Sequence, residues 1–389
     1  MPYSRFLTIL ALSTLIDATT FAIVFFSPRK PRPGTPPQSP LDLRRFLQAL
    51  VAAAAVFTLQ LPLCWSLGFN FFGLVYLAYL VAFVLIPLGG LVILAVAMLD
   101  RRANPRPRVA TSVCYAAAIA LLMAPLGAYA TYVEPHRLKL ETPVMPLPPQ
   151  RSGTSPIRIG ILADIQTDHV TEYEVSAVKR LMAERPDIIL LPGDLFQNPW
   201  TGASGETAAM HDLLCRLNAP AGAYIVPGDV DHSPQFDAML AGTPVKVLRN
   251  TIVRFTANDR RITLGGVELD CFSPAALDTM RQLETAPGDE DIRILLSHRP
   301  DAVLELARHS RIDLVVSGHT HGGQVVIPWF GPPITLSRVP RDIARGGLHD
   351  FNGDNIYISR GVGSERGQSP MLRLNCPPEI TLLTLDRLP

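Results

Sequence analysis

The apolar residues of this chain are arranged differently in its first third and in the rest. In the first third they form four long stretches, at residues 6–26, 46–67, 71–99 and 109–132. Each exceeds the roughly 18 weakly charged residues that a helix needs to cross a bilayer. We therefore expect an all-α membrane domain of about four transmembrane helices over residues 1–132.

The remaining two thirds carry much shorter apolar runs. Runs of five or six residues, such as 157–162 and 292–296, are typical of strands that are buried on both faces of a sheet. The segments between them, such as 172–185, have the apolar spacing of helices. This alternation predicts an α/β fold over residues 157–389, with polar residues gathered where the strands end. The proline-rich residues 133–156 are expected to form an extended linker.

Two features of the apolar stretches leave alternatives open. Pro87 and Gly89-Gly90 interrupt the third stretch, which therefore forms either one long bent helix or a re-entrant pair. Asp17 is the only acidic residue inside the four stretches. It is either satisfied by a neighbouring helix or a functional intramembrane group, because such acids are costly in lipid.

Charge predicts the orientation of these helices. Five basic residues lie within residues 27–45 and four within 100–108, whereas the connection at residues 68–70 has none. By the positive-inside rule, the two basic connections face the cytoplasm. Both termini and the α/β domain are then expected on the periplasmic, extracytoplasmic side of the cell membrane.

Overall composition adds two bounds. The net charge is +1 over 389 residues, which argues against nucleic-acid binding. Five cysteines, three of them in the second part, imply no disulfide framework. Neither bound indicates the oligomeric state.

Five polar clusters follow apolar runs of the second part. They are, in order, Asp164-Ile165-Gln166, Gly193-Asp194, Gly228-Asp229-Val230-Asp231-His232, Ser297-His298-Arg299 and Gly318-His319-Thr320-His321. Imidazole nitrogens and carboxylate oxygens are common ligands for divalent metals, and the adjacent glycines let the backbone approach closely. The clusters therefore predict a metal site at the strand ends; the alternative for the His-x-His pair alone is an ordinary surface loop.

The order of these clusters resembles the ligand set of the calcineurin-like metallophosphoesterases, which reads Asp, Gly-Asp, Gly-Asn-His-Asp, His and Gly-His-x-His. The match covers about residues 157–387, and its closing segments, 357–363 and 378–380, are similar to the bacterial membrane-associated branch with N-terminal transmembrane helices. The resemblance implies a four-layer α/β sandwich, two divalent metal ions and hydrolysis of a phosphomonoester or phosphodiester. Two cations suit this chemistry because they neutralise the phosphate oxygens and activate water.

The resemblance also implies a role for individual residues. Asp194 would bridge the two metals. The remaining metal ligands would be Asp164, Gln166 and His321 at one metal, and Asp229, His298 and His319 at the other. The catalytic candidates are Asp231 and His232, and the candidates for binding substrate phosphate are Arg299 and Arg360.

Three positions depart from the family pattern. Gln166 replaces a histidine, and its carbonyl oxygen favours Mn²⁺ or Mg²⁺ over Zn²⁺, with iron and zinc kept as alternatives; His169 is an alternative ligand. Asp229 replaces an asparagine and adds a negative charge, which should hold metals tightly and weaken the attraction for phosphate. Val230 replaces a histidine near the leaving group, where a positioned acid is worth about 10²–10⁴-fold in rate.

The prediction is a membrane-anchored, dinuclear-metal-dependent phosphoester hydrolase acting on an envelope or lipid-derived phosphate. Its partners are then a phosphoester substrate and the lipid bilayer, and its expected metal is manganese. One alternative is a catalytically degenerate receptor for a phosphate ligand, favoured by Val230. Another is a transport or scaffold protein in which the helices around Asp17 act.

Overall fold

The computed structural model describes residues 2–27, 41–105, 107–151, 153–197, 206–231 and 234–387. The chain separates into two compact units. One comprises Met1–Ala130 with Gly367–Pro370, and the other Thr131–Arg366 with Met371–Pro389. The first unit is helical and the second contains the strands.

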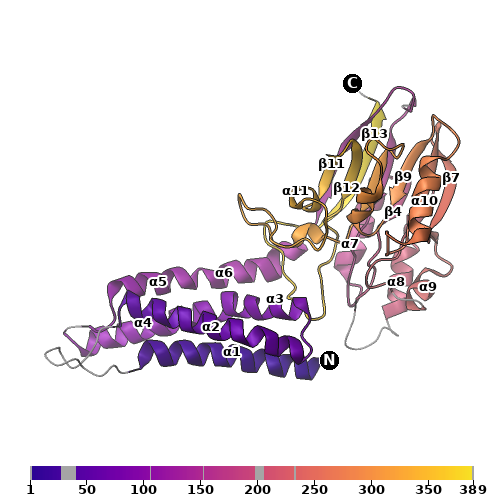
Figure 1. The fold of residues 1–389 in the computed structure, drawn as a ribbon. Coiled ribbons are helices and arrows are strands. Elements are labelled where there is room, and N and C mark those ends of the chain that lie inside the picture. Colours follow the sequence, from indigo (N-terminus) through magenta and orange to yellow (C-terminus); the bar gives the residue numbers. More distant parts are fainter. Residues whose placement is uncertain are drawn as a thin grey trace. The chain divides into compact units, whose positions relative to one another are not determined.

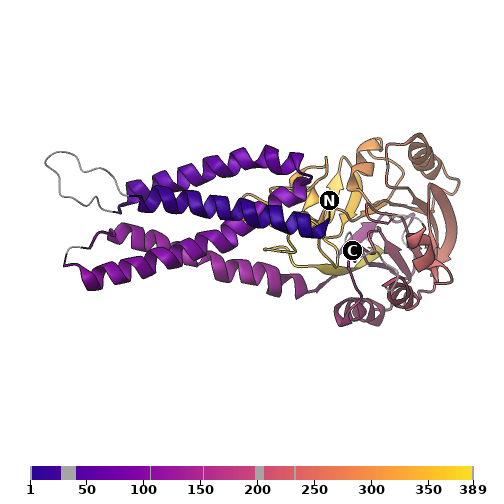
Figure 2. The ribbon, with the colours of Figure 1, turned by 90° about the horizontal axis from the view of Figure 1, so that it is seen from below.

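The helical unit is a bundle whose helices run side by side (Figures 1 and 2). α1 packs along α2, and α4 packs along α5. The helices are α1 (Tyr3–Phe26), α2 (Leu43–Ser66), α3 (Phe71–Leu80), α4 (Ile86–Ala103), α5 (Thr111–Leu121) and α6 (Met123–Ala128), with π-helical turns η1 (Val81–Leu85) and η2 (Tyr129–Val133). Four helical segments of the described chain are long and apolar enough to cross a membrane: Tyr3–Phe26, Leu43–Ser66, Phe71–Ala103 and Thr111–His136. The four apolar helices predicted from the sequence are thus confirmed.

The third apolar stretch is one continuous helix rather than a re-entrant pair. α3 passes through η1 into α4, and Pro87 follows directly at the second position of α4. Proline lacks an N–H, and its ring collides with the carbonyl four residues earlier in a regular α-helix. Phe83, four residues before Pro87, lies in the wider π turn at Val81–Leu85. This turn accommodates the proline without breaking the helix.

The described ends of the two basic connections, at Leu41 and Arg108, meet at one end of this bundle. Leu41 N donates to Arg108 O (2.8 Å), and Ala110 N donates to Leu41 O (3.1 Å). The buried Asp100 accepts hydrogen bonds from Asn104 Nδ2 (2.8 Å), Val109 N (3.2 Å) and Arg108. The residues directly before α2 and α5 therefore lie on the same side of the bundle.

The strands of the described second unit form two sheets. The first has the order β1 (Lys139–Glu141), β13 (Glu379–Arg387), β3 (Ile157–Ile161), β4 (Ile188–Leu191), β5 (Ala223–Ile225) and β6 (Val245–Val247), and β2 (Val144–Leu147) also pairs with β13. The second has the order β11 (Gly347–Phe351), β12 (Asp354–Ile358), β10 (Leu314–Ser317), β9 (Ile292–Leu296), β8 (Arg260–Gly266) and β7 (Thr251–Ala257).

The two sheets pack face to face between outer layers of helices (Figure 1). Leu190 of β4 and Ile294 of β9 share the core between the sheets. Ile189, on the opposite face of β4, packs in a second core with α7 (Glu172–Ala183), α8 (Glu206–Leu214) and α9 (Gln235–Leu240). α10 (Pro274–Glu284) and α11 (Arg341–Ala344) form a third core with the outer face of the second sheet. This is the predicted four-layer α/β sandwich, and it explains why central strands such as β4 are apolar on both faces.

Part of the segment expected to be a linker forms strands instead. β1 and β2 both pair in parallel with β13. In β2 the side chains of Met145 and Leu147 are buried, while the residues between and before them are exposed. This alternation lets one face of β2 join the core between the sheets, and Pro146 is tolerated at the exposed edge.

Candidate metal centre

The five polar clusters lie at the carboxyl ends of neighbouring strands. β3, β4 and β5 run parallel in the first sheet, and β9 and β10 run parallel in the second. Parallel strands deliver the residues that follow them to one edge of a sheet. The packing of the two sheets therefore brings together side chains that are widely separated in the chain, Asp164, Asp194, Asp229, His298 and His319.

These five side chains form two groups with the spacing of metal ligands. Among the described residues, one group is Asp229, His298 and His319, and the other is Asp164, Asp194 and His298. His298 Nε2 lies 3.4 Å from Asp194 Oδ2 and 3.2 Å from Asp229 Oδ2. His319 Nδ1 lies 2.8 Å from the same oxygen of Asp229. In this arrangement His298 is the member shared by both groups.

At several of the predicted ligand positions the backbone adopts a left-handed conformation that residues other than glycine rarely adopt. Five of the predicted ligands have positive φ: Asp164 (46°), Gln166 (37°), Asp194 (57°), His319 (70°) and His321 (48°). Such residues persist only where their surroundings fix them, and they cluster at functional sites. At Asp194 the backbone N donates to Asp231 Oδ2 (2.7 Å), and Oδ1 accepts from Val230 N (3.0 Å). A Cβ on Gly228 would lie 2.6 Å from Asp194 N, so the glycine is required for this approach.

His298 is oriented by a backbone carbonyl. Its side chain is fully buried, and its Nδ1 lies 2.7 Å from Pro192 O, which fixes the proton on Nδ1 and turns Nε2 toward the carboxylates of Asp194 and Asp229. Burial alone would lower the pKa of His298, but the facing carboxylates of Asp194, Asp229 and Asp164 raise it to about 10. Burial also raises the pKa of Asp164 to about 6, and that of Asp194 well above its usual range. Without metal, the raised pKa values of His298, Asp164 and Asp194 favour bound protons at the centre. A divalent cation would supply the same positive charge.

Gln166, two residues after Asp164, carries a buried amide whose oxygen is unused. Its side chain is buried, and its Nε2 donates to Gln197 Oε1 (3.0 Å) and Glu365 Oε2 (3.1 Å). These two acceptors determine which end of the amide is the nitrogen. Oε1 is buried without a hydrogen-bond partner, as a ligand to a hard cation would be before binding. The donor set of carboxylate, imidazole and amide oxygen fits a pair of divalent metals.

Comparisons with known proteins agree with this chemistry. The family model described as calcineurin-like phosphoesterase matches residues 157–323. The metallophosphoesterase YkuE of Bacillus subtilis (strain 168) is 30% identical over 265 residues, covering 66% of this chain and 88% of YkuE. The chain belongs to the calcineurin-like phosphoesterase family.

Other relatives of this phosphoesterase have named activities. The phosphodiesterase YaeI of Escherichia coli (strain K12) is 31% identical over 247 residues, covering 60% of this chain and 84% of YaeI. The UDP-2,3-diacylglucosamine pyrophosphatase LpxG of Chlamydia trachomatis serovar D is 24% identical over 315 residues, covering 66% of this chain and 91% of LpxG. The predicted class, a metal-dependent phosphoester hydrolase, is confirmed by this membership.

The phosphoesterase compensates for the additional charge of Asp229. Arg299 Nη2 contacts Asp229 Oδ1, and Arg299 Nε lies 3.3 Å from Asp229 Oδ2. Although burial raises it, the pKa of Asp229 is lowered by hydrogen bonds from His298, His319 and Arg299. The weaker attraction for phosphate expected from Asp229 stays a prediction; in the structure its charge is paired with a guanidinium.

Asp231 faces the backbone rather than the two metal-ligand groups. Its carboxylate accepts hydrogen bonds from three N–H groups, those of Asp194 (2.7 Å), Leu195 (2.9 Å) and Gly228 (2.9 Å). It therefore positions the loops that carry Asp194 and Asp229. His232, the other predicted catalytic residue, lies outside the described residues.

His321, a predicted ligand, belongs to neither of the two groups found among the described residues; it is buried and is held by an arginine. Arg373 Nη2 lies 3.4 Å from His321 Nδ1 and also donates to Gly363 O (2.5 Å). Burial and the nearby Arg373 hold the pKa of His321 well below its usual value, so its ring is neutral, as a metal ligand must be.

Two other predicted residues are engaged elsewhere. Arg360 Nε contacts Glu379 Oε2, and Arg360 Nη2 lies 2.5 Å from Glu141 Oε1, so this guanidinium ties β13 to β1. His169, the alternative to Gln166, is mostly exposed and lies 2.9 Å from Asp168 Oδ1. Neither belongs to the two metal-ligand groups found among the described residues.

Two residues of the site, Glu365 and Gln197, were not identified from the sequence. Glu365 follows β12, which pairs in parallel with β10 and therefore ends at the same edge. That strand order was the available signal, but the sequence alone does not reveal which strand neighbours β10.

Proposed function

We propose that this phosphoesterase hydrolyses a lipid-linked or other envelope phosphoester outside the cytoplasm, anchored by four transmembrane helices. The observation that carries the catalytic part is the pair of ligand groups around His298, together with the unpartnered Oε1 of Gln166.

The proposed ligand assignment follows the family pattern. Asp194 is the proposed bridge, Asp164, Gln166 and His321 are the proposed ligands of one metal, and Asp229, His298 and His319 are the proposed ligands of the other. Two divalent cations supply charge neutralisation and water activation when bound. Manganese is the proposed metal, because the Gln166 oxygen favours a harder cation than zinc.

The protein groups around the metals have separate proposed roles. Arg299, whose side chain is 40% exposed, neutralises Asp229 and offers its remaining N–H groups to substrate phosphate. Asp231 positions the loops that carry Asp194 and Asp229. His232 is the proposed proton donor to the leaving oxygen.

The membrane part of the proposal rests on the helical unit. The four helices satisfy the length and composition of membrane spans, and the described ends of both basic connections meet at one end of the bundle. The positive-inside rule assigns that end to the cytoplasm, and the chain leaves the bundle at the opposite end. The last apolar helix ends at His136 and β1 begins at Lys139, so the connection between them is short.

The substrate proposal draws on the relatives. YaeI is named a phosphodiesterase, and LpxG is named for a diacylated sugar nucleotide. We therefore propose a phosphodiester or pyrophosphate bond in an acylated molecule rather than a small soluble monoester.

The test is hydrolysis by the full-length protein in nanodiscs, with the metal content measured in parallel. A chromogenic phosphodiester, the matching monoester and an acylated diester are compared in Mn²⁺, Mg²⁺ and Zn²⁺. Asp194→Asn should abolish metal-dependent turnover, whereas Asp289→Asn, at an exposed position, should leave it intact. Two bound metals without turnover of any ester would contradict the catalytic proposal and favour a receptor.

A further inference from the structure

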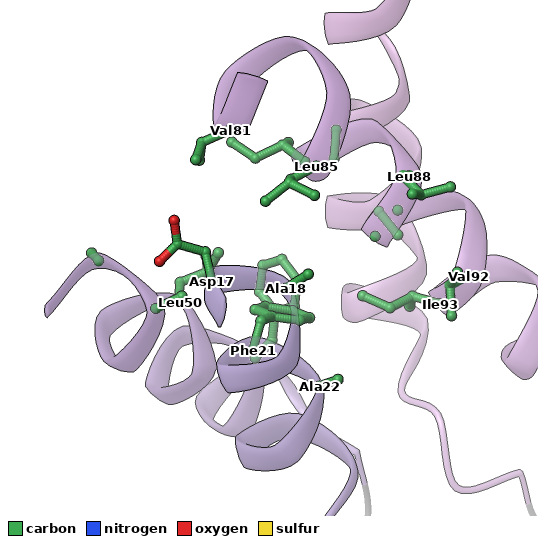
Figure 3. A pocket seen from close by; sticks show the side chains of 18 of the residues that line it. Asp17, Ala18, Phe21, Ala22, Leu50, Val81, Leu85, Leu88, Val92 and Ile93 are labelled. Atoms are coloured by element: carbon green, nitrogen blue, oxygen red, sulfur yellow. The ribbon is translucent and has the colours of Figure 1, made fainter. Parts of the chain in front are cut away.

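A cavity of about 560 Å³ lies within the helical bundle. It is lined almost entirely by apolar side chains from α1, α2, α3, η1, α4 and α5 (Figure 3). Small residues such as Ala18, Ala54 and Gly90 leave the space, and the π-helical turn η1 contributes Val81 and Leu85. π-helical turns are rare and often mark functional sites.

Asp17 points into this apolar cavity. Figure 3 shows its carboxylate directed into the space between α1 and η1, toward Val81. The residue is 4% exposed, and its Oδ1 accepts a hydrogen bond from Gln60 Nε2 (2.7 Å). Its Oδ2 is buried and has no hydrogen-bond partner in the described part of the chain. A half-satisfied acid among apolar groups is costly unless something supplies the missing partner.

The other buried acid of the bundle shows the contrast. Both oxygens of Asp100 accept hydrogen bonds, Oδ1 from Asn104 Nδ2 (2.8 Å) and Oδ2 from Val109 N (3.2 Å). A structural role therefore explains why this acid is buried. In Asp17, by contrast, only Oδ1 has a hydrogen-bond partner among the described residues. The second oxygen is therefore available to a ligand.

The cavity is open at its rim. Five large apolar side chains that line it are exposed: Phe26 (37%), Leu50 (37%), Ile86 (38%), Leu88 (52%) and Val92 (44%). Asp17 lies nine residues before Phe26, or about 14 Å along the helix. If the helices span a membrane as proposed, this rim faces lipid, and an apolar chain can enter from the bilayer.

We propose that this cavity binds a membrane lipid whose apolar chain carries a hydroxyl group, with that hydroxyl hydrogen-bonded to Asp17 Oδ2. A hydroxyl has one donor and two acceptor lone pairs, so it complements Oδ2 whether or not that oxygen carries a proton. An ammonium would bring three donors to a cavity whose described lining offers one available carboxylate oxygen. A plain hydrocarbon would leave Oδ2 unsatisfied.

This site goes beyond the proposed hydrolysis and rests only on the proposed membrane position of the helices. The test uses the full-length protein in nanodiscs and two photoactivatable probes. One is a long-chain fatty ester with a mid-chain hydroxyl and a diazirine; the other is identical but lacks the hydroxyl. The hydroxylated probe should label cavity peptides of α1, α2 and α4 about tenfold more strongly, as expected for one hydrogen bond to a buried carboxyl group.

Variants distinguish the contribution of the Asp17 hydrogen bond to labelling from that of the cavity volume. Asp17→Leu should reduce labelling by the hydroxylated probe to the level of its deoxy analogue. Ala82→Trp, which fills the cavity, should reduce labelling by both probes, whereas Ala55→Trp, on the exposed face of α2, should change neither. Metal-dependent hydrolysis of a soluble phosphodiester is measured on each preparation and should be unchanged, so failure of the catalytic proposal is recognised separately.

The wild-type comparison alone can overturn the proposal, even if a variant does not fold. Equal labelling by the two probes would show that Asp17 does not recognise a hydroxyl. Equal loss of labelling in Ala82→Trp and Ala55→Trp would show that the label reports the lipid-facing surface rather than the cavity.

Discussion

Gln166 Nε2 donates to Glu365 Oε2 across 3.1 Å, although the two residues are 199 positions apart in the chain. The same nitrogen donates to Gln197 Oε1, and Gln197 Nε2 in turn donates to Glu365 Oε1 (2.9 Å). This triangle holds the amide of Gln166 with its oxygen left for a cation. Glu365 is therefore a positioning residue for a proposed ligand.

Replacing Glu365 by alanine should weaken metal binding by about 10–100-fold, the usual effect of losing a partner that orients a metal ligand. Isothermal titration with Mn²⁺ measures the affinity, and the metal concentration for half-maximal hydrolysis should shift in parallel. Glu290→Ala removes an equivalent charge at an exposed position and should leave both values unchanged. Unchanged affinity in Glu365→Ala would mean that Gln166 does not need this orientation.

The pairing of Arg299 with Asp229 predicts a coupled effect on substrate binding. Arg299→Leu should raise KM several-fold for an anionic phosphodiester, because the full charge of Asp229 is then uncompensated. Asp229→Asn restores the asparagine of the family pattern and should recover part of that loss in the double variant. A double-mutant cycle on kcat/KM measures the coupling, and strictly additive effects would show that the two charges act independently.

Position 230 predicts a gain of activity. Val230 N supports Asp194 through the backbone, so a new side chain at this position leaves that hydrogen bond in place. Val230→His supplies the family's imidazole and should raise kcat, with an upper range of about 10²–10⁴-fold if no other acid serves the leaving group. Val230→Leu is the control for bulk. A gain confined to substrates with poor leaving groups would identify proton donation, whereas no gain would indicate that another group already fills the role.

The charge of the centre predicts how metal-free protein responds to pH. His298 has a pKa near 6.5 in an unfolded chain and about 10 in the folded protein. Its protonation therefore contributes stability that is fully present below pH 6.5 and is lost as the pH rises toward 10. The free energy of unfolding should fall across this window, and His298→Gln should flatten the decline while His211→Gln, in α8, should not.

Metal should counter that decline. Binding requires a deprotonated His298 Nε2 and ionised carboxylates, so affinity should rise with pH. The increase in Tm on adding Mn²⁺ should accordingly be greater at pH 9 than at pH 6. Calorimetry with and without chelator measures it, and a metal-independent Tm at both pH values would contradict the proposed centre.

The sequence determined much of this protein through local patterns. Stretches such as 71–99 are too long and apolar for anything but a membrane-type helix, and runs such as 157–162 require a strand buried on both faces. The order of Asp, Gly-Asp and Gly-His-x-His identified the family, because metal chemistry restricts residue type and local turn geometry together.

Only the tertiary structure decided which distant groups meet. Arg299 and Arg360 look alike in sequence, yet one pairs with Asp229 beside the metal ligands and the other joins Glu379 to Glu141. Glu365 became part of the site because β12 neighbours β10, and the second oxygen of Asp17 was left without a partner because four helices enclose a space around it. Strand order and side-chain packing depend on long-range contacts, which the local pattern of a chain does not encode position by position.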